Sequence, residues 1–340
     1  MVPDLHAVII DPAFLGDTVF DGPLARALKR RHPAGRVGLV VRPPSDRIAR
    51  RLLHVDRVHV FDKRGADRGW RGLKRLAAEL AAEGYQEAYI PHPSLRSVLL
   101  ARLAGIPRRV GATQGTFAGL WLTERHPSTG TFVTDRLGLL GPDVQGVDLQ
   151  SLSGLMRRPP PDPTSGPQRI GLCLGSEWAT KRWPIARVAE LCRALDPSRH
   201  RLVLLGAPWE SPLFQALREA APEALASAED QTQGDLDGLI DALGTCRVVL
   251  GGDTGPVHLA RALGIPVVAL FGPTSEARHA FEAQDQVLFE RIDCRPCSPH
   301  GHDRCPLGHH RCLVDLSGER VRGAVIRALE HANPARGDRV

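Results

Sequence analysis

Residues 247–274 read RVVLGGDTGPVHLARALGIPVVALFGPT, and this stretch predicts the fold of the chain around it. A run of three apolar residues ends at two glycines, which is typical of a buried parallel strand followed by a turn. Asp253 or Thr254 can cap a helix that Gly264 ends, and a second apolar strand follows. Such a unit presents free backbone N–H groups above the strand ends, which favours an anionic ligand such as a phosphate.

The glycine cluster has a second interpretation, in which it only makes a tight turn. Asp253, Thr254 and His258 nevertheless bring a carboxylate, a hydroxyl and an imidazole to the same helix start. This is more polar chemistry than a turn requires. We therefore expect the turn around Gly255 to bind phosphate.

Strand and helix patterns alternate along both halves of the chain, which predicts an α/β protein with two domains of about 150 residues each. Five prolines in residues 157–168 mark the linker. We expect a first domain at residues 1–156 and a second at residues 169–316. In residues 317–340 we expect a helix that could pack back on the first domain, and then a polar tail.

The composition is that of a globular protein, with 24% charged and 42% hydrophobic residues. No apolar run approaches the ~20 residues that cross a bilayer, and residues 1–11 do not resemble a secretory signal. We therefore expect a cytoplasmic protein. The net charge of +6 could attract nucleic acid, an anionic membrane face or phosphorylated substrates, or it could reflect arginines on solvated helices. Aromatic residues are only 5% and do not interleave with basic clusters, so nucleic acid is not favoured.

Asp17 lies just after the first predicted strand, where open α/β sheets bind ligands. Its carboxylate could take a proton there, or could only stabilise the start of the next helix, predicted to be capped by Thr18. Basic residues follow other strands or helices. If their loops share one face, they form a basic rim suited to an acceptor that carries phosphates or carboxylates. The rim residues are Lys63, Arg64, Arg96, Arg108 and Arg109, and scattered surface arginines are the alternative.

The second half contains the loop GSEWATKRWP at residues 175–184. Its Lys181 follows a strand and a glycine turn and could neutralise a diphosphate as a point charge. Glu210, also after a predicted strand, could accept hydrogen bonds from sugar hydroxyls.

Four cysteines lie close together near the end of the second half. Cys294, Cys297, Cys305 and Cys312 fall within nineteen positions, with several histidines among them. In a reducing compartment this arrangement indicates either a structural zinc or iron site or a cluster of reduced thiols.

Five segments together resemble glycosyltransferase family 9, the ADP-heptose:lipopolysaccharide heptosyltransferases, and are most similar to the type that adds the second heptose. They are LGDTVFDGPLARALKRRHP, PSLRSVLLARLAGIPRRVGA, GSEWATKRWP, GGDTGPVHLARALGIPVVALFGPT and CRPCSPHGHDRCPLGHHRC. The resemblance implies a GT-B architecture, in which two Rossmann-like domains face each other across a cleft.

The resemblance also implies an inverting heptosyl transfer from ADP-heptose to a lipopolysaccharide inner-core acceptor. Asp17 would be the general base, and Lys181 with the free N–H groups of residues 254–258 would stabilise the leaving diphosphate. Catalysis would need no metal or cofactor. The acceptor would be an anionic glycolipid at the inner face of the cytoplasmic membrane, bound by Lys63, Arg64 and Arg96, with the enzyme peripheral to that membrane. The donor-binding residues would be Ser176, Thr180, Lys181, Glu210, Asp253, Thr254, Gly255 and His258.

Three other functions remain to be weighed. A nicotinamide-dependent dehydrogenase would carry G-x-G-x-x-G after its first strand, whereas residues 11–17 read DPAFLGD. A non-catalytic glycolipid-binding protein would have no need of both Asp17 and Lys181. A family relative that uses another sugar nucleotide, or a protein acceptor, stays open.

Overall fold

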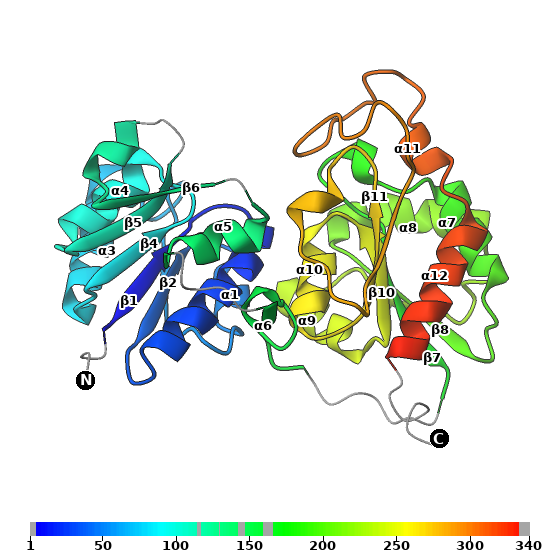
Figure 1. Cartoon of the computed structure of the whole chain (residues 1–340). Helices are drawn as coiled ribbons and strands as arrows, with labels where there is room; N and C mark the ends of the chain where they lie inside the picture. The colour runs from blue at the N-terminus through cyan, green and yellow to red at the C-terminus, as the bar shows by residue number, and fades with distance from the viewer. Residues whose placement is uncertain (1–4, 114–116, 129, 142–146, 159–165, 333–340) are drawn as a thin grey trace. The chain divides into compact units, whose positions relative to one another are not determined.

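The computed structural model describes residues 5–113, 117–128, 130–141, 147–158 and 166–332. The chain divides into two compact units, Met1–Arg157 with Arg278–Ala280 and Arg158–Ala277 with Phe281–Val340 (Figure 1). The division falls at the start of the expected linker. Most of that linker and the expected polar tail lie outside the described residues.

The first unit holds a sheet of six parallel strands in the order β3-β2-β1-β4-β5-β6. The strands are β1 (Ala7–Ile10), β2 (Val37–Val41), β3 (Arg57–Val60), β4 (Glu87–Ile90), β5 (Arg108–Thr113) and β6 (Glu124–Pro127). The helices are α1 (Leu15–Arg31), α2 (Asp46–Ala49), α3 (Gly69–Glu83), α4 (Leu95–Leu103), α5 (Phe132–Gly138) and α6 (Val147–Gln150). Strand β1 is buried along its whole length, as its apolar run predicts for a parallel sheet covered on both faces.

The second unit repeats this plan with the order β12-β11-β10-β7-β8-β9, again all parallel. The strands are β7 (Gln168–Cys173), β8 (His200–Leu205), β9 (Glu229–Gln231), β10 (Val248–Gly252), β11 (Val267–Phe271) and β12 (Gln286–Phe289). The helices are α7 (Ile185–Ala194), α8 (Ser211–Ala220), α9 (Leu236–Thr245), α10 (Gly255–Ala262), α11 (Arg311–Val314) and α12 (Gly318–His331). The predicted strand, turn, helix and strand of residues 247–274 are β10, α10 and β11, and Gly264 has a φ of 75°.

Each sheet reverses its strand order at one point, between β1 and β4 in the first and between β7 and β10 in the second. Open parallel sheets bind ligands in the crevice outside the carboxyl ends of the strands at such a point. The loops after these four strands are therefore where a site is expected. The α/β prediction with two Rossmann-like halves is confirmed.

Two sequence-based expectations are wrong. Residues 108–113 form β5, and Arg108 bonds to Glu87 and Glu124 at the first positions of β4 and β6. Arg108 thus lies at the amino edge of the sheet, and Arg109 bonds to the carbonyl of Trp121. Neither joins a basic rim at the opposite edge, because starts and ends of parallel strands lie at opposite edges.

Helix α12 was expected to pack back on the first domain. Its apolar face instead packs on α7 and on strands β10 to β12 of the second unit. The buried residues of this face are Val321, Ala324, Val325, Ala328 and Leu329. The helix therefore completes the second core. Among the described residues, no helix combines the length and apolar character that a bilayer crossing requires.

Candidate functional site

Asp17 lies in the first turn of α1, directly beyond the end of β1. The helix begins four residues earlier than the Thr18 cap predicts, because the Oδ2 atom of Asp17 accepts a hydrogen bond from the backbone N–H of the actual cap residue, Phe14, at 3.0 Å. The side chain stays 15% exposed. Asp17 therefore stabilises the helix start and still reaches solvent.

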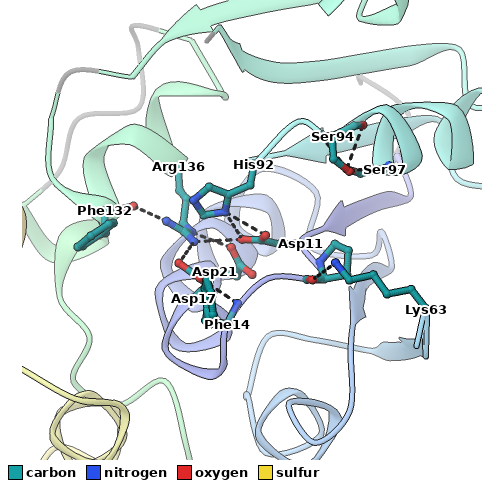
Figure 2. Close-up of polar contacts among 11 residues, drawn as sticks. Asp11, Phe14, Asp17, Asp21, Lys63, His92, Ser94, Ser97, Phe132 and Arg136 are labelled. Atoms are coloured by element: carbon teal, nitrogen blue, oxygen red, sulfur yellow. Dashed lines mark hydrogen bonds and ion pairs between the residues drawn. The ribbon is translucent and has the colours of Figure 1, made fainter. Parts of the chain in front are cut away.

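Arg136 joins Asp17 to two further carboxylates. It projects from α5, which packs against α1, and its side chain is 2% exposed. The Nη2 atom donates to Asp17 Oδ1 and to Asp11 Oδ2, both at 3.1 Å, and Nε donates to Asp21 Oδ1 at 2.7 Å. Figure 2 shows the guanidinium in contact with all three aspartates. One buried cation thus fixes the orientation of three carboxylates.

The carboxylates of this group differ in their ionisation. Burial and the negative charge of Asp11 raise the pKa of Asp21 well above its ordinary value, since Arg136 is shared and cannot neutralise all three groups. Burial also opposes the ionisation of Asp11, but His92 and Arg136 outweigh it and the pKa of Asp11 is lowered. Asp21 is accordingly the weaker acid of the buried pair that it forms with Asp11.

His92 completes this group from the loop after β4. Its Nδ1 atom lies 3.0 and 3.1 Å from the two oxygens of Asp11. Sequence reasoning missed Asp11, Asp21, His92 and Arg136. Asp11 and His92 directly follow β1 and the end of β4, and their position beside the reversal in strand order is the signal that could have found them.

Three of the predicted rim residues come together beyond the ends of β3 and β4. Burial lowers the pKa of Lys63, and the positive charges of Arg42, Arg64 and Arg96 add to this effect. The Nζ atom of Lys63 donates to the carbonyl of Pro12 at 3.2 Å. Arg42 follows β2 and was missed. We call Arg42, Lys63, Arg64 and Arg96 the basic group.

In the second unit, Lys181 and Asp253 are brought together from the loops after β7 and β10. Lys181 Nζ lies 2.9 Å from Asp253 Oδ2, which also accepts a hydrogen bond from Thr274 at 2.9 Å. The Nε2 atom of His258 lies 3.3 Å from Asp253 Oδ1. A carboxylate repels an anionic ligand, so Asp253 is not suited to contact a phosphate itself. Its contacts instead orient Lys181 and His258.

The start of α10 offers fewer donors than the sequence suggests. The N–H groups of Val257 and His258 bond to the carbonyl of Thr254 at 3.2 and 3.4 Å, and Pro256 has no N–H. The donors that can face a ligand therefore precede Pro256, at Thr254 and Gly255. The expectation that the whole 254–258 turn presents free N–H groups is corrected in this respect.

The remaining predicted donor-binding residues flank Lys181. Ser176 is buried, and its Oγ accepts a hydrogen bond from the N–H of Trp178 at 3.2 Å. The hydroxyl of Thr180 both donates to and accepts from the backbone of His302, each at 2.8 Å. Thr180 thus holds the cysteine-containing segment, which leaves its hydroxyl little capacity for a ligand.

Glu210 lies beyond the end of β8, against Gly175 in the loop after β7. Its Oε2 atom accepts a hydrogen bond from the N–H of Ala207 at 2.8 Å. Burial raises the pKa of Glu210, while this N–H and Arg182 oppose the rise. A Cβ atom at Gly175 would lie 1.3 Å from Oε1, so the carboxylate packs directly on the backbone there.

The four cysteines of residues 294–312 are free thiols that lie near one another. Burial and the neighbouring Cys297 and Cys305 raise the pKa of Cys312 to about 11. In the part of the chain that is described, the sulfur atoms of these cysteines do not come together closely enough to hold one ion between them. The expected metal site is therefore not formed by these positions of the side chains.

Two Rossmann-type sheets, each with charged groups at its strand reversal, are the fold of the GT-B class. Residues 73–310 match the family model of glycosyltransferase family 9 (heptosyltransferase), and the chain belongs to this family.

Individual relatives agree with this assignment. The chain is 25% identical to lipopolysaccharide heptosyltransferase 2 of Escherichia coli K12 over 365 residues, with 93% of this chain and 96% of that protein covered. Two solved structures share the fold. The family 9 glycosyl transferase from Veillonella parvula has a TM-score of 0.80 at 20% identity, covering 97% of this chain and 99% of that one. The E. coli ADP-heptose lps heptosyltransferase II has a TM-score of 0.75 at 22% identity, covering 96% and 99%.

Proposed function

We propose that this glycosyltransferase moves a heptosyl residue from ADP-heptose to a lipopolysaccharide inner-core acceptor, with inversion at the anomeric carbon. The relatives named as lipopolysaccharide heptosyltransferase 2 support the donor and acceptor classes. The observation that carries the proposal is the division of charge between the units. Asp17 stands at the strand reversal of the first unit and Lys181 at that of the second.

Lys181 and the start of α10 stabilise the leaving group. As the anomeric bond breaks, negative charge accumulates on the diphosphate, and Lys181 offers a positive charge already oriented by Asp253 at 2.9 Å. The N–H groups of Thr254 and Gly255 add fixed dipoles. Groups that are oriented before the reaction need no reorganisation during it, which is the main source of such stabilisation. Ser176, Glu210 and His258 hold the rest of the donor.

Asp17 acts as the general base. It removes the proton of the acceptor hydroxyl while that oxygen attacks the anomeric carbon from the face opposite the diphosphate. The basic group binds phosphates or carboxylates of an anionic glycolipid at the inner face of the cytoplasmic membrane. A different sugar nucleotide or a protein acceptor would use the same two charged centres.

The test is Asp17→Ala, with donor binding and turnover measured separately. We expect turnover to fall about 10²-fold or more while the Kd for ADP-heptose stays within a few-fold, because a base acts mainly in the transition state. Asp46→Ala is the matched control, since Asp46 also lies in the first turn of a helix, α2. Retained turnover in Asp17→Ala would remove the aspartate from the mechanism.

For the cysteine-containing segment we propose a structural zinc or iron ion, which would have to draw the four sulfur atoms closer together than the structure has them, with reduced thiols as the alternative. The four thiols are neighbours, and Gly301 of the same segment packs on Trp178 and Lys181 of the donor loop. An ion would stiffen that loop without entering the reaction. Elemental analysis of wild type and Cys297→Ser decides between the two, with Cys192→Ser as control because Cys192 is buried in the second core. Less than one equivalent of metal per wild-type chain would contradict the metal site and support the alternative of reduced thiols.

A further inference from the structure

The pair formed by Asp11 and His92 has no part in the mechanism above, although it lies beside the proposed base. Asp11 directly follows β1 and His92 follows β4, so the pair stands at the reversal in strand order of the first sheet. Asp11 is linked to Asp17 by one nitrogen atom, the Nη2 of Arg136, which lies 3.1 Å from each carboxylate. Figure 2 shows the imidazole of His92 and the guanidinium of Arg136 on the same side of Asp11.

The contact between the two residues fixes the tautomer of the imidazole. Asp11 is fully buried and has a lowered pKa, so its carboxylate is ionised and can only accept a hydrogen bond from Nδ1 of His92. Nδ1 must then carry a hydrogen atom, and in the neutral ring the lone pair is at Nε2. Within the described ranges, Nε2 makes no hydrogen bond. The side chain is 46% exposed, whereas that of Asp11 is 0% exposed.

The surroundings suit a group that gains and loses a proton. Burial lowers the pKa of His92, but the hydrogen bond to Asp11 and its charge outweigh burial and raise the pKa overall. Arg136 opposes this rise and Asp17 adds to it. The ring borders a cavity of about 50 Å³ that Ser128, Asp135 and Arg136 also line, which is polar and large enough for a water molecule.

Both oxygens of the Asp17 carboxylate already accept a hydrogen bond. Its Oδ1 accepts from the cationic Arg136, and its Oδ2 accepts from the backbone N–H of Phe14. Each oxygen keeps a second lone pair, which can take the proton of the acceptor hydroxyl. The proton must then pass on before the next turnover, and His92, whose Nε2 makes no hydrogen bond among the described residues, is a nitrogen base close enough for the charge of Asp17 to raise its pKa.

We propose that His92 is a second catalytic residue, which accepts at Nε2 the proton that Asp17 removes from the acceptor hydroxyl and then releases it to water. This inference rests on the base role proposed for Asp17. The O–H bond of the acceptor breaks as its oxygen bonds to the anomeric carbon, and the bond from that carbon to the diphosphate breaks with its electron pair. The proton passes from Asp17 to His92, directly or through one water, and leaves as hydronium or buffer acid. Asp11 is the positioning residue of the pair.

The experiment is chemical rescue of His92→Ala with imidazoles of graded basicity. We expect turnover to fall at least tenfold without a matching rise in the KM for the donor, and added imidazole to restore it with a rate that increases with the basicity of the imidazole. His54→Ala is the matched control, since His54 lies in the same unit away from this group, and its turnover is expected to match that of wild type without any response to imidazole.

His92→Gln separates proton transfer from positioning, because its amide nitrogen can still donate to Asp11 but cannot take a proton. We expect it to be as slow as His92→Ala. Wild-type turnover in His92→Gln, or a slow His92→Ala that imidazole does not restore, would overturn the proposal. A melting temperature near that of wild type shows that the variants fold.

Failure of this inference differs from failure of the proposed base. Active His92→Ala beside inactive Asp17→Ala removes only the second proton acceptor. Active Asp17→Ala with intact donor binding removes the base, whatever His92 does. We expect Asp17→Ala to stay inactive in imidazole, because the oriented carboxylate itself is missing.

Discussion

At the scale of single residues, Arg136 determines how the first-half site is organised. Its guanidinium bonds to Asp11, Asp17 and Asp21 through two of its nitrogens and to the carbonyl of Phe132 through the third. Lysine would retain the charge but not the planar fork that reaches several carboxylates at once.

We predict that Arg136→Lys lowers turnover about 10²-fold, since an error of about 1 Å in the position of a catalytic group can cost that much. Steady-state kinetics with saturating donor provide the measurement. Arg125→Lys serves as control, as it changes another arginine of the same unit. Equal rates in the two variants would show that Asp17 does not depend on Arg136 for its orientation.

Gly175 has a similar role in the second half, because the carboxylate of Glu210 occupies the space of a side chain. We predict that Gly175→Ala displaces Glu210 and weakens donor binding about tenfold, by analogy with the loss of one charged hydrogen bond. Calorimetric titration with ADP-heptose measures the change. Gly234→Ala should bind normally, since the nearest atom to its added Cβ is 3.9 Å away.

The sequence predicts the residues of the site unevenly. Asp17, Lys181 and Glu210 could be found because each follows a recognisable apolar strand. Arg136 could not, because it reaches Asp17 from α5, and only the packing of α5 on α1 makes that contact. Thr180 was assigned to the donor for its position beside Lys181, while its hydroxyl in fact holds the backbone of His302.

At the scale of elements, apolar periodicity predicts buried strands better than edge regions. Strands β1, β10 and β11 are apolar throughout and fall where the pattern puts them. Strand β5 begins with two arginines and was taken for a loop. A strand can begin with this arginine pair because Glu87 and Glu124 on the neighbouring strands neutralise the charge of Arg108. This compensation is visible only once the strands are paired.

Helix α12 leads to a prediction about the stability of the second unit. Because its apolar face closes the second core, Leu329→Ala should destabilise the second unit by about 2–5 kcal/mol, from lost burial and the cavity left behind. Urea unfolding followed by tryptophan fluorescence measures the change, with Trp70 and Trp121 of the first unit replaced by phenylalanine so that the signal comes from Trp178, Trp183 and Trp209 of the second. Leu307→Ala should change little, as Leu307 is 63% exposed. A change below 1 kcal/mol for Leu329→Ala would mean that α12 is not part of this core.

At the scale of the whole molecule, the proposed donor-binding residues and the proposed base belong to separate units with separate cores. ADP should therefore bind to and stabilise the second unit alone. At a hundred times its Kd it should add about 2.7 kcal/mol to the free energy of unfolding of that unit and so raise its melting temperature. Differential scanning calorimetry measures this shift. We expect Lys181→Ala to reduce it and Lys63→Ala to leave it unchanged. A loss of the shift in Lys63→Ala would place nucleotide contacts in the first unit.

The two sheets share one strand order, so each half carries its own crevice and its own interior. The loops proposed to bind the acceptor could then be replaced without disturbing the side chains proposed to bind the nucleotide. Chimaeras that exchange only the loops after β2, β3 and β4 offer a practical route to new acceptor specificities, and the same independence would allow a lineage of such enzymes to diversify its products while keeping one sugar donor.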